Sequence, residues 1–106
     1  MITVVVQFQL PKGTTREEVF RTFQTSTSRY HGMPGLIRKY YLYGDEGVAG
    51  GAYLWEGREA AEAVYTDEWR QNAKKRYGVE PTIAYFETPL VVDNDSGDQS
   101  VERLRD

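Results

Sequence analysis

One histidine, His31, is the only side chain in the sequence that changes its charge near neutral pH without special tuning. It ends a face of an expected helix that starts with Phe20 and Phe23 and then turns polar through Thr27 and Tyr30. In a pocket, His31 could act as a general base toward a phenol or an acidic C–H bond. The alternative is a histidine stabilised by the helix dipole at the C-terminal end of the helix. The residues leave both open.

Large aromatic side chains form a second group of candidates. They could stack on a planar aromatic ligand and hydrogen-bond its oxygens, or they could simply pack the core or a dimer interface. Tyr65 is the second candidate for a catalytic role beside His31. The aromatic candidates for substrate binding are Tyr30, Tyr40, Tyr53, Trp55 and Trp69, with Thr27 beside them.

Arg38 is the charged candidate, because its neighbours in an expected strand are bulky and apolar. A guanidinium there could bind a carboxylate or stabilise an enolate or a peroxide. The alternative, which the residues favour, is an exposed position or a salt bridge across the hairpin.

Several classes of function are excluded by composition. The 106 residues include no cysteine and one histidine, so thiolate chemistry and multi-histidine metal sites are ruled out. No dinucleotide, phosphate-loop or serine-hydrolase motif is present, so we expect no cofactor and no metal. The net charge of -3 disfavours nucleic acid, and no apolar run could span a membrane. The N-terminus lacks signal-peptide features, so a cytoplasmic location is expected.

Hydrophobic periodicity predicts the elements that must position these residues. Strict alternation predicts strands over 2–10, 36–43, 48–56 and 79–88, and a capping box at Thr15 and Glu18 opens a helix that ends near Gly32. Two helical pieces follow over 57–65 and 66–78. The order βαββαβ is the ferredoxin-like arrangement, an α+β fold with a four-stranded antiparallel sheet.

The charge is distributed unevenly along the chain. Residues 1–90 hold 11 basic and 11 acidic side chains and every aromatic residue, whereas residues 91–106 hold 2 basic and 5 acidic ones. We therefore predict a neutral, aromatic-rich domain over 1–90 and an acidic, mobile C-terminal tail over 91–106.

Both faces of the expected sheet are apolar. The second strand carries Ile37, Tyr41 and Tyr43 on one side and Leu36, Tyr40 and Leu42 on the other. Helices cover one face of such a sheet, so the other face needs a partner. A homodimer with sheet facing sheet is the simplest solution.

The stretch from Met33 to Val64 resembles the dimeric α/β-barrel proteins of the antibiotic biosynthesis monooxygenase type. The residues that carry the resemblance are Pro34-Gly35-Leu36, Gly50-Gly51 with Tyr53-Leu54-Trp55, and Arg58-Glu59-Ala60-Ala61. The YdhR-like branch is the most similar. The resemblance implies a homodimer, and a pocket between the sheet and the helices. Haem-degrading relatives use a helix histidine, for which His31 is the only candidate, and the sequence does not support haem.

Three functions follow. The first is a cofactor-independent monooxygenase in which His31 or a tyrosine deprotonates a phenolic or polyketide-like substrate that then reacts with dioxygen. The second is a cyclase, isomerase or lyase in the same pocket. The third is a small-molecule-binding or stress-associated dimer without catalysis. We favour the first, mainly because of the resemblance.

Overall fold

A four-stranded antiparallel sheet carries three helices in the computed structural model, which describes residues 1–94 and 101–102. The strands lie in the order β2-β3-β1-β4, which confirms the ferredoxin-like α+β prediction. The elements are β1 (Ile2–Gln9), α1 (Arg16–Tyr30), β2 (Leu36–Tyr43), the 3₁₀ turn η1 (Asp45–Gly47), β3 (Val48–Trp55), α2 (Arg58–Val64), α3 (Asp67–Tyr77), β4 (Thr82–Glu87), β5 (Val91–Val92) and β6 (Val101–Glu102).

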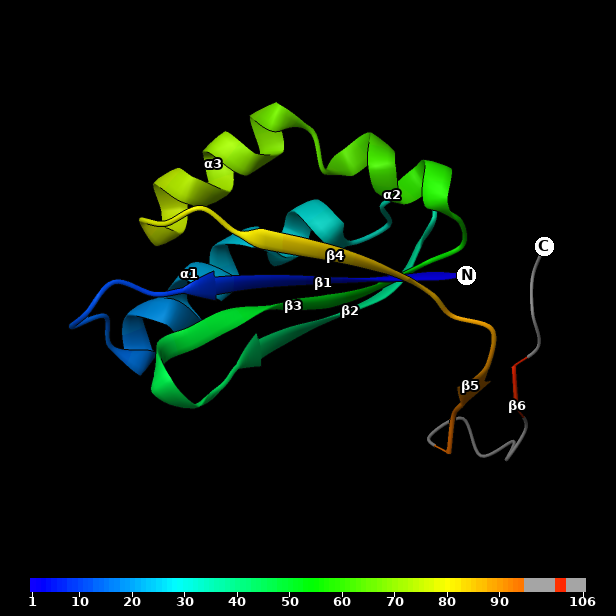
Figure 1. Ribbon diagram of the computed structural model, residues 1–106, viewed down its shortest axis with the longest axis horizontal. Helices are drawn as coiled ribbons and strands as arrows, with labels where there is room; N and C mark the ends of the chain where they lie inside the picture. The colour runs from blue at the N-terminus through cyan, green and yellow to red at the C-terminus, as the bar shows by residue number, and fades with distance from the viewer. Residues whose placement is uncertain (95–100, 103–106) are drawn as a thin grey trace.

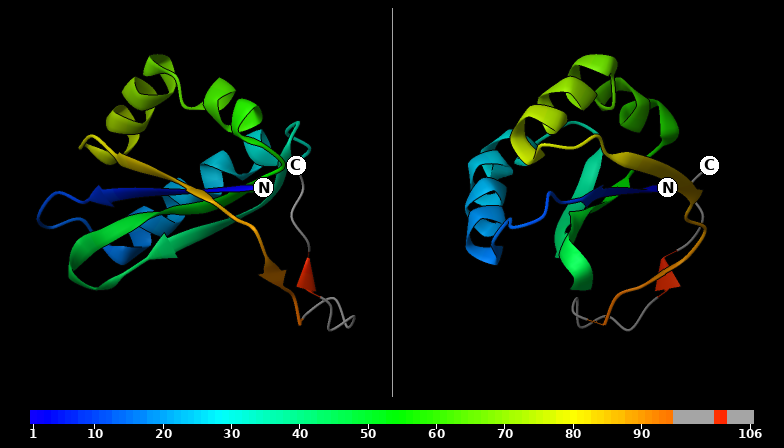
Figure 2. Two further views of the ribbon diagram at one scale, coloured as in Figure 1. Left: turned by 45° about the vertical axis from the view of Figure 1, so that its right-hand side comes forward. Right: turned by 60° about the vertical axis from the view of Figure 1, so that its left-hand side comes forward.

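All three helices lie on one side of the sheet (Figure 1). The other side carries no helix, and β5 and β6 extend from the end of the sheet at which β4 finishes (Figure 2). We call the helix-covered side the inner face and the opposite side the outer face. None of the helices in the described part of the chain combines the length and apolar character needed to cross a membrane.

The core lies between the inner face and the helices. Alternate residues of β1 are buried there, and Val4 and Val6 are almost completely inaccessible. β3 adds Tyr53 and Trp55 on the same face, because each of them pairs with an inward-facing residue of β1. The period of two that the sequence predicts for these strands is therefore confirmed.

α1 begins as the capping box predicts, because the Thr15 side chain accepts a hydrogen bond from the Glu18 amide at 3.1 Å. Its buried stripe differs from the expected one. Val19, Phe23 and Ser26 are buried, whereas Phe20 is partly exposed. Ser26 and Tyr30 continue the stripe, rather than Thr27 and His31, because they follow Phe23 at intervals of three and four residues.

β2 differs from the expected alternation at its start. The register moves from Leu36 opposite Trp55 to Arg38 opposite Leu54, so Ile37 is an extra residue. The bulge puts Leu36 on the inner face. The prediction that Leu36 and Tyr41 lie on opposite faces of the strand was therefore wrong. Tyr41 faces inward and Tyr40 faces outward, on opposite sides of the strand as predicted.

Within β3, the backbone at Gly50 lies very close to the backbone of β1. A Cβ atom at Gly50 would overlap the carbonyl group of Val6 on the neighbouring strand, so only glycine fits there. The register between β1 and β3 is regular through this point.

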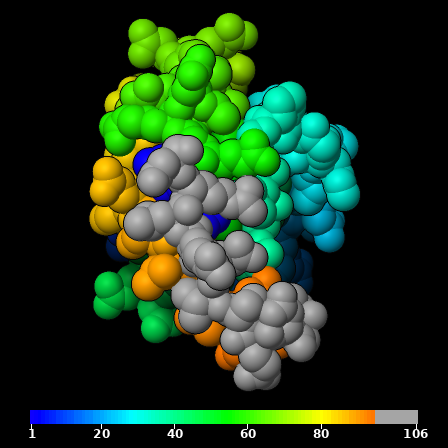
Figure 3. All heavy atoms as spheres, turned by 90° about the vertical axis from the view of Figure 1, so that its right-hand side faces the viewer, coloured from blue at the N-terminus to red at the C-terminus, as the bar shows by residue number. Residues whose placement is uncertain are grey.

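The helical conformation is interrupted between α2 and α3 at Thr66. The Thr66 side chain accepts a hydrogen bond from the Trp69 amide at 3.2 Å and so starts α3. Gly78 ends α3 with a φ angle of 81°. At the far end of the molecule, the connection from α1 to β2 lies beside α2 (Figure 3), and a Cβ at Gly35 would meet Ala60.

The C-terminal segment contains a short pairing of Val91–Val92 with Val101–Glu102. Directly after Val92, Asp93 forms an ion pair with Arg38 at 3.3 Å. The boundary at residue 90 and the mobile tail stay predictions, and residues 95–100 and 103–106 lie outside the described residues.

Candidate functional site

Two adjoining spaces lie along α1 on the inner side of the sheet. The first is a cavity of about 40 Å³ between the sheet, α1 and α3. The second is an open groove of about 300 Å³ between the C-terminal end of α1 and β2. Tyr30, Lys39 and Tyr41 line both spaces, so they form the wall that the two share.

Lys39 occupies the centre of this wall. Its Nζ lies 3.8 Å from the ring centroid of Tyr30, 3.9 Å from that of Tyr41 and 4.6 Å from that of Tyr53. The ammonium group is thus surrounded by the faces of three tyrosine rings, which attract a cation electrostatically. The ion pairs among the described residues are Arg38–Asp93 and Arg58–Glu62, and neither involves Lys39.

Local sequence explains why a lysine can point inward here. Lys39 and Tyr41 are two residues apart on β2, so their side chains leave the same face of the strand. Lys39 pairs with Tyr53, and Tyr41 pairs with Gly51. A Cβ at Gly51 would lie 3.2 Å from Lys39 Cε, so the missing side chain provides the space that the lysine stem fills.

The surroundings of Lys39 favour loss of the proton from its ammonium group. Burial, followed by the positive charges of Arg29 and Arg76, lowers the pKa of Lys39 from 10.5 to about 7. The ring faces oppose this shift in part, because they stabilise the ammonium form. Near neutral pH, Lys39 therefore exists both as an amine and as an ammonium ion, which suits a group that accepts and returns a proton.

Burial keeps two of the tyrosines beside Lys39, Tyr41 and Tyr53, as neutral phenols. The hydroxyls of Ser26 and Tyr41 are 2.7 Å apart, and Trp69 Nε1 donates to Tyr30 Oη at 3.1 Å. Burial raises the pKa of both Tyr41 and Tyr53. These phenols can therefore donate hydrogen bonds but cannot serve as proton acceptors at neutral pH.

The structure brings together four of the residues that the sequence marks as candidates at the groove. Thr27, Tyr30, His31 and Arg38 all line it, and His31 lies at the C-terminal cap of α1 with an exposed side chain. Two further candidates, Tyr53 and Trp69, line the cavity together with Tyr30.

Two aromatic candidates lie in the core, outside both spaces. Trp55 is completely buried, and its Nε1 donates a hydrogen bond to Tyr65 Oη at 3.2 Å. Burial raises the pKa of Tyr65 far above the neutral range, although the Trp55 hydrogen bond acts in the opposite direction. These contacts explain both residues as packing, so the proposals below give them no role in chemistry.

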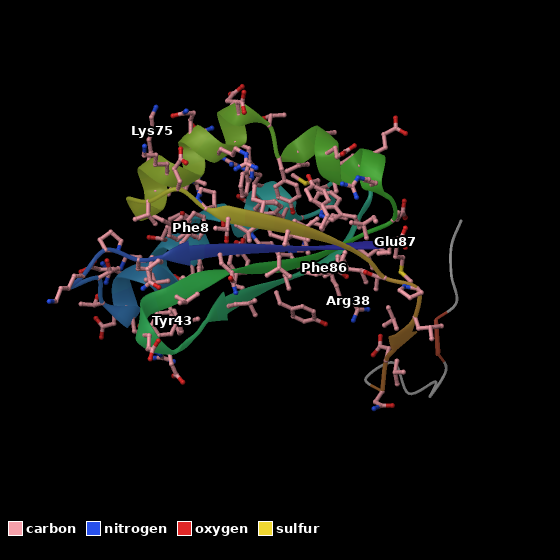
Figure 4. The ribbon with its side chains drawn as sticks, viewed as in Figure 1. Phe8, Arg38, Tyr43, Lys75, Phe86 and Glu87 are labelled. Atoms are coloured by element: carbon pink, nitrogen blue, oxygen red, sulfur yellow. The ribbon has the colours of Figure 1, made fainter. Side chains whose placement is uncertain are left out.

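The remaining candidate, Tyr40, lies on the outer face with 55% of its surface exposed. Arg38 Nη1 donates to Tyr40 Oη at 3.3 Å, and Arg38 also pairs with Asp93. Figure 4 shows Arg38 on the side of the sheet away from α3, while Lys75 points outward from that helix. Arg38 reaches the groove only because β2 is an edge strand.

Sequence reasoning missed the charged residues of the cavity, which are Lys39, Arg29 and Arg76. A signal for Lys39 was available, since it alternates with Tyr41 on the strand face that meets the helices. Arg29 and Arg76 carried no signal, because arginines near helix C-termini are ordinary partners of the helix dipole.

The buried amine predicts a pH dependence of stability. Between pH 7 and 10.5 the unfolded chain retains a proton at Lys39 that the folded protein has lost. The free energy of unfolding of the wild type, compared with that of Lys39→Met, is therefore expected to rise with pH through this window. Urea unfolding of both proteins at several pH values measures the difference, and a constant difference would contradict the prediction.

The other charged and titratable groups around Lys39 come from the helices and strands that surround it. Arg29 and Arg76 stay charged throughout. Burial raises the pKa of Tyr77 to about 12, and raises those of Tyr41 and Tyr53 as well. The full set is Arg29 and Tyr30 on α1, Tyr41 on β2, Tyr53 on β3, and Arg76 and Tyr77 on α3. These groups are present in both the wild type and Lys39→Met, so their contributions cancel in the difference between the two free energies of unfolding.

Comparison with known proteins identifies the fold. No family model matches the chain, and no curated protein sequence matches it. Among solved structures, SnoaB, a cofactor-independent oxygenase from Streptomyces nogalater, has a TM-score of 0.64 at 15% identity, over 86% of this chain and 95% of its own. A monooxygenase from the gene ActVA-Orf6 of Streptomyces coelicolor, in complex with the ligand nanaomycin D, has a TM-score of 0.61 at 14% identity, over 80% and 84% of the two chains.

The same fold also occurs without an assigned function. A protein of unknown function from Nitrosomonas europaea, NE2512, has a TM-score of 0.66 at 12% identity, over 82% of this chain and 87% of its own. The chain therefore has the ferredoxin-like fold of the antibiotic biosynthesis monooxygenase-like proteins. At these identities the similarity establishes the fold alone, and the YdhR-like branch stays a prediction.

Proposed function

We propose that this protein is a cofactor-independent monooxygenase that acts on a small phenolic or polyketide-like aromatic substrate. The observation that carries the proposal is the tyrosine-lined wall between the sheet and α1, with the half-buried amine of Lys39 at its centre. The groove of about 300 Å³ is at the lower limit of the size that a small aromatic ligand needs, which is roughly 300–1,000 Å³. The aromatic rings of Tyr30 and Tyr41 offer surfaces on which such a ligand can stack.

The reaction needs no external reductant if the substrate supplies the electrons. A base removes the O–H proton from the enol, or phenolic, form of a substrate with an activated CH₂ group. The resulting anion also carries charge on that carbon, which reacts with dioxygen to give a peroxide. Loss of the second C–H proton and cleavage of the O–O bond leave a ketone, and the other oxygen atom departs as water. One substrate molecule and one dioxygen molecule thus give one quinone-type product and one water.

The structural neighbours support this proposal. SnoaB is itself described as a cofactor-independent oxygenase, and the Streptomyces coelicolor monooxygenase was solved in complex with the ligand nanaomycin D. Within the described residues, no group of three or more acidic or histidine side chains could hold a metal ion. A cofactor-free reaction in the cytoplasm is part of the proposal.

Oxygen uptake tests the proposed function directly. Purified protein is supplied with a panel of anthrones and dihydroxy-aromatic compounds in buffer without flavin, haem or added metal. We expect uptake with at least one compound that binds, at a rate that follows the protein concentration. No uptake with any compound shown to bind would reject the monooxygenase. Turnover that persists without oxygen would instead favour a cyclase, isomerase or lyase, and binding without turnover would favour a non-catalytic dimer.

The outer face of the sheet supports a homodimer as part of the proposal. Apolar side chains stand exposed there, including Tyr40, Leu42 and Phe86, which are 55%, 40% and 53% exposed. The sheet register also places Val5, Ala52 and Leu54 on this face. Exposed apolar side chains gathered on one face usually mark a contact with a partner, and a second copy offers the same surface for a two-fold interface.

A charge placed in this face is expected to separate the two copies. Leu42→Lys would put an ammonium group into the proposed interface and shift the protein from dimer to monomer. Light scattering during size-exclusion chromatography measures the molar mass. Gln71→Lys, at an exposed position of α3, is the matched control and should remain a dimer. A monomeric wild type, or a Leu42→Lys variant that stays dimeric, would contradict the interface.

A further inference from the structure

The two spaces beside α1 share an unusual charge pattern. Arg29, Lys39 and Arg76 line the cavity. His31 and Arg38 line the groove with Lys39, and Arg38 is paired there with Asp93. No carboxylate of the described residues lines either space. Low-dielectric walls with charges of one sign concentrate ligands of the opposite charge. The pattern therefore indicates a ligand that carries negative charge when it is bound.

The two spaces differ in size, so each of them can hold a different part of such a ligand. The cavity of about 40 Å³ has room for only a few water-sized groups, so it cannot hold an aromatic ring. The groove of about 300 Å³ can hold the ring. Lys39 lies in the wall between them, where it can meet an oxygen atom at the edge of a ring bound in the groove.

We propose that Lys39 is the proton acceptor and anion-binding residue of this site, and that the substrate is an acidic phenol or enolisable ketone whose ionised oxygen binds Lys39 Nζ. This assignment rests on the proposed function for its role in oxygenation. The step is a single proton transfer: the phenol O–H bond breaks, the proton joins the Lys39 amine, and the resulting phenolate remains paired with the ammonium ion. The phenolate is the electron-rich form that can then react with dioxygen.

The surroundings of Lys39 support both halves of this step. Before the transfer, burial and the charges of Arg29 and Arg76 favour the neutral amine, because they lower the pKa of Lys39 to about 7. After the transfer, the faces of Tyr30, Tyr41 and Tyr53 stabilise the ammonium ion. The phenolate then supplies the counter-charge that the ion pairs of the described residues do not provide.

His31 is the competing base, and its position differs from that of Lys39. It lines only the groove and is exposed to solvent at the end of α1. Water therefore weakens its field at a bound oxygen, whereas Lys39 acts from a less hydrated position with a higher effective interaction energy. If Lys39 is the base, replacing Lys39 abolishes ionisation of the ligand and replacing His31 does not. If His31 is the base, the opposite result is expected.

The test uses para-nitrophenol, whose phenolate form absorbs visible light and whose neutral form does not. Native protein in excess is added to the ligand at a pH below the ionisation of the free ligand, under nitrogen. We expect the phenolate absorbance to increase on binding, and the affinity for the phenolate to fall by about 10-fold or more in Lys39→Met. Lys75→Met removes an exposed lysine from α3 and should bind as the native protein does.

Each outcome decides the proposal. Loss of the absorbance change in Lys39→Met but not in His31→Ala supports it, provided that circular dichroism shows both variants folded. An unchanged affinity in folded Lys39→Met, loss of binding only in His31→Ala, or no ionisation by the native protein would overturn it. If Lys39→Met fails to fold, the native protein still tests the assignment, because its phenolate affinity should fall as the pH rises from 7 and Lys39 loses its proton.

The experiment also separates this assignment from the monooxygenase itself, since it needs neither oxygen nor turnover. Ionisation of the ligand without oxygen uptake by any substrate would keep the anion site and reject the oxygenase. Oxygen uptake with an unaltered ligand spectrum would keep the oxygenase and reject the anion site. Para-nitroanisole, the methyl ether that cannot ionise, should bind about 10-fold or more weakly than the phenolate.

Discussion

Replacing Lys39 with methionine is expected to lower kcat/KM for oxygen uptake by about 100-fold or more, the usual contribution of a positioned general base. Methionine has a similar length and keeps the apolar stem packed against Gly51 and the tyrosine rings. It removes the amine that takes the proton and the charge that holds the phenolate. The loss should therefore appear in kcat as well as in KM, because the proton transfer itself is affected.

The measurement is the initial rate of oxygen uptake with the best substrate of the panel, over a range of pH. The wild-type rate should depend on the ionisation of Lys39, and Lys39→Met should lose that dependence. His31→Ala should keep it, and so should the control Lys75→Met. If His31→Ala loses as much activity as Lys39→Met, or if Lys39→Met retains wild-type kcat/KM, the assignment of the base is wrong.

Replacing Trp55 with alanine is expected to lower the free energy of unfolding by about 3–5 kcal/mol, a large part of the total of roughly 5–15 kcal/mol. Trp55 is completely buried and stacks beside Tyr53 with ring centroids 6.2 Å apart. Alanine would leave a cavity at the centre of the core and remove the donor to Tyr65. Chemical denaturation followed by circular dichroism measures the loss.

Tyr65→Phe provides a milder variant of the same pair. It leaves the ring in place but removes the acceptor of the Trp55 Nε1 hydrogen bond, at a cost of about 1–3 kcal/mol. Because Trp55 and Tyr65 lie outside the cavity and the groove, Tyr65→Phe should keep the wild-type KM and kcat while folded. A large fall in kcat with unchanged stability would place Tyr65 in the reaction, as the sequence alone first suggested.

Much of the fold follows from local sequence patterns. The alternation of β1 predicts its buried face because one side of the strand carries only apolar residues, and Thr15 and Thr66 predict the starts of two helices because their hydroxyls satisfy free amides. The bulge at Ile37 could not be predicted. It depends on how Leu36 packs opposite Trp55 across two strands, which no short-range pattern reports.

The site was predictable only in part. Tyr30, Tyr53 and Trp69 do lie around the cavity, whereas Trp55 and Tyr65 are packed in the core. An aromatic residue fits either place, so its type does not decide between them. Lys39 was missed because lysine in a strand usually points to solvent. Its burial depends on the space above Gly51 and on tyrosines from distant parts of the chain.

The most direct test of the central claim follows the oxygen atoms. The substrate that supports oxygen uptake is converted under isotopically heavy dioxygen in ordinary water, without cofactor, and the product is analysed by mass spectrometry. The proposed function predicts one heavy oxygen atom in each product molecule, with formation abolished under nitrogen and strongly reduced in Lys39→Met. A product that carries oxygen only from water, or that forms equally well without dioxygen, would contradict it.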